Sequence, residues 1–153
     1  MIKRFVKHQL DIISEEPWFG DGFRSKIDQL SNEEAFIKPL PSLHSVAELL
    51  SHCTEWKKEG INQLKGNLPV LNMESPDNWK TIETLKKMGW EKIREDFYDA
   101  VKKLVSILKT KDDDFLEELT ADKRYTYQYL LEGLLDHDVY HMGQIAITIK
   151  LMQ

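Results

Sequence analysis

Four long stretches of the chain repeat apolar residues every three or four positions, and this spacing is the feature that most constrains the fold. It places apolar side chains on one side of an α-helix, whereas no stretch shows the alternation and hairpin turns of strands. The stretches cover about residues 2–16, 45–66, 79–108 and 126–152 of the 153-residue chain. Four amphipathic helices in a chain of this length predict an all-α protein, a four-helix bundle forming one domain over residues 1–153.

Local signals mark where these helices begin and end. Pro17 limits the first helix, and a short helix over residues 23–30 is expected to follow it. The second begins near Ser42 or Ser45, because Ser45 with Glu48 three positions later is typical of a capping box. The third is expected as one long helix from about Trp79 to the charge run Lys109–Asp114.

The apolar side chains of the first and last helices are expected to face the core. These residues are Ile2, Phe5, Val6, Leu10 and Ile13 in the first helix, and Tyr129, Leu130, Leu134, Ile145, Ile149 and Met152 in the last.

Charge and cysteine content limit the classes of partner and the cellular compartment that we expect for this protein. The net charge of −5 argues against nucleic acid as the main partner, because phosphate binding needs concentrated Lys and Arg. The single cysteine, Cys53, allows no internal disulfide, which favours a reducing compartment. Neither a signal peptide nor a membrane span is expected, so we predict a cytoplasmic protein that binds no membrane.

Two histidines, His137 and His141, lie four positions apart in the last helix. Residues at this spacing project about 40° apart around the helix axis, so both imidazoles can reach one divalent metal. His52, in the middle of the second helix, is the best source of a third ligand. His44 is expected to be exposed before that helix, and His8 lies off the apolar stripe of the first.

A helical histidine is more often a core-edge residue with satisfied ring nitrogens than a ligand, so the residues alone leave both roles open. If a metal binds, three imidazoles suit zinc, nickel or iron(II). Three protein ligands also leave a position open for a water or a substrate thiol.

Three neighbouring polar residues are candidates for supporting catalysis. Glu48 lies one turn before His52, Asp138 follows His137, and Gln144 lies three positions after His141. For each carboxylate the alternative is a solvated acid on the polar face of its helix. We expect Trp56 and Cys53 to be core residues rather than parts of the site.

The final helix resembles the signature of the DinB/YfiT-like superfamily in the segments Tyr127–Gly133 and His137–Ile145. The segment His44–His52 followed by Trp56, and the segment Asp77–Trp79, are similar to further parts of the family pattern. The likeness covers essentially the whole chain.

The resemblance implies an up-down-down-up four-helix bundle with His52, His137 and His141 as ligands of a divalent metal. Nickel or zinc is the metal that it favours, with iron or manganese as alternatives. It also implies a homodimer and a small-molecule substrate, with a low-molecular-weight thiol as one option.

Three functions remain open from the sequence. The first is a metal-dependent enzyme with thiol S-transferase-like or hydrolase-like chemistry. The second is a non-catalytic metal-binding or stress-response interaction module, and the third is a structural dimer with vestigial histidines. Family membership by itself does not identify the reaction.

Overall fold

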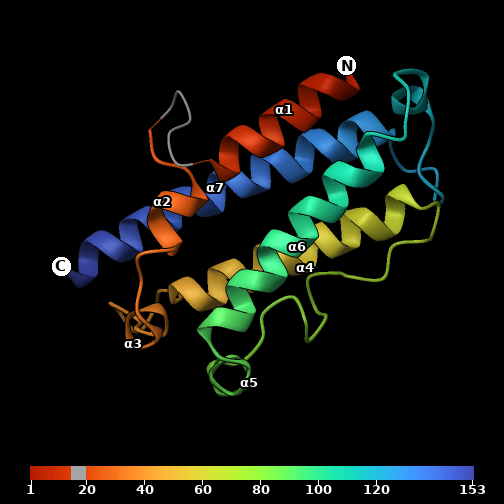
Figure 1. The fold of residues 1–153 in the computed structure, drawn as a ribbon. Helices are drawn as coiled ribbons and strands as arrows, with labels where there is room; N and C mark the ends of the chain where they lie inside the picture. Colours follow the sequence, from red (N-terminus) through yellow and green to blue (C-terminus); the bar gives the residue numbers. More distant parts are fainter. Residues whose placement is uncertain (15–19) are drawn as a thin grey trace.

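A computed structural model describes residues 1–14 and 20–153 of the chain (Figure 1). The described part is helical and contains no strand, only an isolated bridge between Leu119 and Thr126. The long helices are α1 (Ile2–Ile13), α4 (Val46–Leu64), α6 (Trp90–Leu108) and α7 (Tyr127–Met152). The short ones are α2 (Phe23–Ile27), α3 (Asn32–Ala35), α5 (Ile82–Met88) and the 3-10 helix η1 (Asp114–Glu117).

Helix α1 follows the predicted apolar stripe with one exception. Ile2 and Ile13 are buried, but the side chain of Leu10 is 47% exposed and its neighbour Gln9 is buried instead. The prediction that Leu10 faces the core was therefore wrong, and a polar side chain from α1 enters the interior. The predicted end of this helix at Glu16, before Pro17, lies outside the described residues.

Helix α4 begins where the capping box predicted. Ser45 is its N-cap and accepts a hydrogen bond from the Glu48 amide, while the Glu48 carboxylate accepts one from the Ser45 amide. These reciprocal bonds satisfy two backbone donors that a helix start leaves without partners. Gly66, just after the helix, adopts a positive φ of 82°.

The predicted third helix is two helices, so the expectation of one long helix was wrong. Thr81 caps α5, and Gly89, which has a φ of 83°, separates α5 from α6. A positive φ is incompatible with α-helical geometry and favours glycine. The chain therefore turns at Gly89 although the apolar spacing continues through it.

Helix α7 matches the prediction of a helix from Thr126 to Met152, with Thr126 as its N-cap. Leu134 and Ile145 are buried, as expected. Tyr129 is not, since its side chain is 65% exposed, so its placement in the core was wrong.

The long helices lie side by side (Figure 1). Helix α4 packs against α6 and α7, and α1 packs against the same two helices. Along the chain, α4 and α6 run in one direction and α1 and α7 in the other (Figure 1). Apolar residues of these helices form two buried clusters. Phe97 of α6 belongs to the first cluster and Leu131 of α7 to the second.

A glycine allows α4 and α7 to approach closely. A Cβ atom placed on Gly60 of α4 would lie 2.4 Å from a terminal methyl group of Leu134 on α7. This approach brings the middle of α4 next to the segment of α7 that carries the two spaced histidines. Among the described residues, no helix combines the length and apolar character that crossing a bilayer requires.

Candidate metal centre

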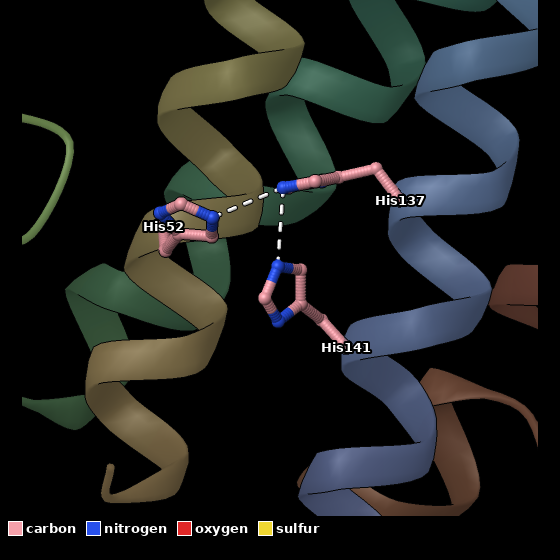
Figure 2. Close-up of side chains that lie close together, drawn as sticks. All are labelled: His52, His137 and His141. Carbon is pink, nitrogen blue, oxygen red and sulfur yellow. Dashed lines mark hydrogen bonds between the residues drawn. The ribbon is translucent and has the colours of Figure 1, made fainter. Parts of the chain in front are cut away.

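The structure brings the three predicted ligands together at the contact between α4 and α7 (Figure 2). His52 projects from α4 toward His137 and His141 of α7. The Nε2 atom of His137 lies 3.0 Å from that of His52 and 3.1 Å from that of His141. These rings form a compact group that could hold a metal ion.

Neighbouring oxygens determine which ring nitrogen carries the proton in two of the three histidines. His52 donates from Nδ1 to the backbone carbonyl of Asn78 over 2.7 Å, and His141 donates from Nδ1 to the Gln144 side-chain oxygen over 2.6 Å. Carbonyl and amide oxygens only accept, so both Nδ1 atoms must be protonated. Each Nε2 atom therefore presents a lone pair to the centre.

This arrangement fits a metal better than it fits three free imidazoles. The single proton that His137 could place on Nε2 cannot fully satisfy the lone pairs of both His52 and His141. A divalent cation would accept all three lone pairs at once. Nitrogen ligands on a tetrahedral zinc ion lie about 3.3 Å apart, close to the two separations measured from His137.

Burial also keeps the three imidazoles neutral, which is the form that binds metals. Loss of hydration lowers the pKa of His52 to about 4, with nearby histidines adding to the effect and the Asn78 carbonyl opposing it. Loss of hydration, together with His141, His52 and Lys57, lowers the pKa of His137 to about 3. Loss of hydration also lowers the pKa of His141, although its bond to Gln144 opposes the shift.

Asn78 was not predicted from the sequence as part of the site. Its side chain is 1% exposed, and its oxygen accepts a hydrogen bond of 2.9 Å from the indole N–H of Trp56. Its amide group in turn donates to the Met73 carbonyl over 3.0 Å. Asn78 thus ties the loop before α5 to α4 and holds its own carbonyl toward His52. The likeness of the segment Asp77–Trp79 to the family pattern points to this loop, but no motif assigns a role to the backbone carbonyl of Asn78.

Aromatic rings surround the histidines on one side. Trp79 lies between His44 and His52, parallel to each, with ring centres 3.9 Å apart in both pairs. Trp56 is partly exposed beside His52 and His137, so the expectation that it is a core residue was wrong. The side chain of His44 is still 43% exposed although its ring stacks on Trp79.

Asp138 lies behind the histidines in a buried polar group. It forms an ion pair with Lys57 of α4, and Gln9 of α1 donates to the same carboxylate oxygen over 3.1 Å. The side chains of Lys57 and Asp138 are each 1% exposed. Asp138 is therefore not a solvated surface acid. Distances of at most 4.8 Å separate its carboxylate oxygen, the Cys53 sulfur and a ring nitrogen of His137.

Cys53 is fully buried, as predicted. Burial, with a smaller effect of Asp138, raises the pKa of its thiol well above the usual value. The thiol therefore stays protonated and behaves as a small core group.

Glu48 lies at the start of α4, and the described contacts of its carboxylate are with residues other than the three predicted ligands. Its carboxylate accepts a hydrogen bond from the backbone N–H of Ser45, forms an ion pair of 2.8 Å with Lys38 and approaches His44 to 3.7 Å. The structure thus places Gln144 in direct contact with a predicted ligand, Asp138 behind the ligands, and Glu48 at the helix terminus.

A cavity of about 560 Å³ opens over the histidines. It lies between α4, α7 and the loops that carry Met73, Trp79 and Tyr125. Its lining residues are His44, His52, Trp56, Met73, Trp79, Tyr125, Tyr129, Leu130, Gly133, Leu134, His137, Tyr140, His141 and Gln144.

Comparison with known proteins agrees with this description. The sequence model of the DinB superfamily matches residues 20–145, a range that includes all three histidines. A crystal structure of a conserved protein from Enterococcus faecalis superposes with a TM-score of 0.68 at 20% identity, covering 98% of this chain and 93% of that one. At that identity the likeness shows the fold alone. A comparison with curated proteins finds no match.

Proposed function

The chain belongs to the DinB superfamily, and from that premise we propose that it is a metal-dependent enzyme. In this proposal His52, His137 and His141 hold a divalent metal and leave a position open for a water or a substrate thiol. The observation that carries it is the convergence of three Nε2 atoms, with two lone pairs directed inward by the Asn78 carbonyl and by Gln144.

A divalent metal held there would supply Lewis acidity, which lowers the pKa of a coordinated water or thiol. The surrounding residues have separate tasks. Asn78 and Gln144 keep two imidazoles in the ligand tautomer, and groups that orient ligands in this way strengthen metal binding. The cavity over the histidines gives a small substrate access to the centre.

Both thiol S-transferase-like and hydrolase-like chemistry belong to the proposal, with nickel or zinc as the preferred metal. Neutral imidazole ligands suit either ion. We assign positioning roles to Gln144 and Asp138. Gln144 contacts His141, and Asp138, which follows His137, holds α7 against α4 through its ion pair with Lys57. Glu48 would act indirectly, through the start of α4 and through His44.

The ligand assignment is tested by replacing His52 with alanine. The wild-type protein, loaded with nickel or zinc and dialysed, should retain about one ion per chain, as a single site requires. His52→Ala should lose nearly all of it when metal content is measured by plasma mass spectrometry. His8→Ala, which removes an exposed histidine from α1, should retain the wild-type amount. Full metal content in His52→Ala would overturn the assignment.

The reaction class needs a separate measurement. The metal-loaded protein should accelerate conjugation of an electrophile by small thiols, or hydrolysis of activated esters, beyond the rate with free metal. Metal binding without any rate gain across both panels would favour the alternative, a non-catalytic metal-binding module.

We also propose that residues 1–153 form one domain, an up-down-down-up four-helix bundle, and that the protein is a homodimer. The chain directions of α1, α4, α6 and α7 support the topology (Figure 1). Their shared apolar clusters support a single domain. Family membership supports the dimer, which light scattering on the purified protein would test.

A further inference from the structure

The residues described as lining the cavity over the histidines include no charged side chain. Among the residues that the structure describes as lining it, none is Asp, Glu, Lys or Arg, although these residues make up 31% of the chain. A second cavity, of about 460 Å³, is lined by Asp21, Lys26, Glu34 and Lys150 among others. The absence of charge therefore distinguishes the cavity at the histidines.

Most of the wall is aromatic or aliphatic. The aromatic residues are Trp56, Trp79, Tyr125, Tyr129 and Tyr140, and the aliphatic ones are Met73, Leu130 and Leu134. Pockets for small organic molecules commonly combine such a surface with a few polar groups and have volumes of about 300–1,000 Å³. The volume of this cavity lies within that range.

Several polar groups of the wall are engaged with other protein groups. Tyr125 donates its hydroxyl hydrogen to Gln63 over 3.0 Å, and the Trp56 indole donates to Asn78. Gln144 uses its oxygen for His141 and its amide group for the Tyr140 hydroxyl, over 3.0 Å. Among the lining residues that the structure describes, the wall therefore offers neutral polar groups but no side chain of opposite charge to a charged ligand.

We propose that this cavity binds the uncharged aromatic or aliphatic body of a small substrate and discriminates against carboxylate, phosphate, sulfonate or ammonium groups on that body. This inference rests on the proposed function, because it assumes that the reacting end of the substrate reaches the three histidines. Away from the three histidines, a charged group on that body would lose water without gaining a counter-charge from the wall, whereas an apolar body gains from leaving water.

Two fluorescent probes test the selectivity in the metal-free protein. N-phenyl-1-naphthylamine is neutral, and 8-anilinonaphthalene-1-sulfonate has the same aromatic body with an added sulfonate. Titrated separately, the neutral probe should bind at least about tenfold more tightly, in keeping with the cost of burying an unpaired charge. Equal affinities, tighter binding of the sulfonate, or no binding of the neutral probe would overturn the inference.

Two lysine substitutions on α7 locate the binding site. Tyr129 lines the cavity and is 65% exposed, whereas Ile147 is 59% exposed on the same helix and does not line it. Tyr129→Lys should reduce the preference for the neutral probe at least about fivefold by offering a charge to the sulfonate. Ile147→Lys should leave the preference unchanged. An equal change in both variants, or no change in Tyr129→Lys, would place the probe elsewhere and overturn the inference.

A second pair of ligands separates this inference from the proposed function. In the cobalt-loaded protein, benzyl mercaptan should produce a thiolate-to-metal absorption band at a concentration at least about tenfold lower than 4-(mercaptomethyl)benzoate. If the protein binds no metal but still prefers the neutral naphthyl probe, the proposed function fails and the cavity inference stands. If metal binds and neither pair of ligands shows a preference, only the cavity inference fails.

Discussion

At the scale of single residues, the site depends on hydrogen bonds that the histidines make away from the centre. The bonds to Asn78 and Gln144 determine where the protons of His52 and His141 lie, and they fix the orientation of the rings. Spacing in the sequence indicated the ligands and Gln144. It could not indicate Asn78, because the acceptor there is a backbone carbonyl that any residue carries.

Replacing Gln144 with leucine should weaken metal binding about 10- to 100-fold, the usual effect of losing a group that orients a histidine ligand. The Nδ1 proton of His141 would lose its acceptor, so the ring could rotate or change tautomer. Competition with a chromogenic chelator measures the affinity. Gln128→Leu is the matched control, because Gln128 lies on the same helix and donates its side-chain hydrogen bond to the nearby Glu132 rather than to a histidine. A wild-type affinity in Gln144→Leu would remove Gln144 from the site.

The lowered pKa values of His52 and His137 should make the metal-free protein less stable in acid. The pKa values of His52 and His137 are about 4 and about 3 in the folded state, against an ordinary value of 6.5. Between pH 6.5 and about 4, the unfolded chain therefore binds protons that the folded protein does not. The free energy of unfolding should fall as the pH drops through this window and should not change from this source above it.

Urea unfolding at pH 7.5, 6.0 and 5.0 tests the acid effect. Between pH 7.5 and 5.0, the free energy of unfolding should fall less in His137→Asn than in the wild type, since the variant lacks one imidazole whose pKa is lowered by folding. The comparison between the two proteins cancels the titration of carboxylates elsewhere. Parallel pH profiles would show that His137 is freely protonated in the folded state.

At the scale of helices, the contact between α4 and α7 is both apolar and ionic. Gly60 permits the close approach, and the buried ion pair of Lys57 with Asp138 joins the two helices behind the histidines. The sequence indicated that Asp138 lies beside the site, but it did not identify Lys57 as the residue that forms an ion pair with it. Lys57 lies on the apolar side of α4, where a lysine is buried only when another helix supplies a counter-charge.

Lys57→Met should lower the free energy of unfolding by about 3–5 kcal/mol, because it leaves Asp138 buried and unpaired. Lys57→Met combined with Asp138→Asn should recover more than half of the loss, since the neutral amide still accepts from Gln9. Urea denaturation at pH 7 measures both variants. A double variant no more stable than Lys57→Met would show that the charge of Asp138 is not the source of the cost.

At the scale of the whole molecule, the proposed metal would link two helices that are far apart in the chain. His52 and the pair His137 and His141 are separated by 85 residues or more. An unfolded chain does not hold these residues together, so a metal that binds the folded state stabilises it.

Saturating metal should therefore raise the stability of the folded protein. At a free metal concentration one hundred times the dissociation constant, the gain should be about 2.7 kcal/mol. Differential scanning calorimetry with and without nickel or zinc measures it as a higher Tm. The shift should vanish in His52→Ala and persist in His8→Ala. An unchanged Tm in the wild-type protein would contradict metal binding by the folded state.

The sequence by itself determined the all-helical class, most helix ends, the DinB resemblance and the three histidines. Each of these is recorded locally, in apolar spacing, capping residues or motif positions. Only the tertiary structure decided that Gly89 divides a predicted helix, that Leu10 and Tyr129 are exposed, and that Trp56 faces the site. It also decided that Asn78 orients His52 and that the described part of the cavity wall carries no Asp, Glu, Lys or Arg. These features depend on which helix faces meet, and that depends on contacts between residues far apart in the chain.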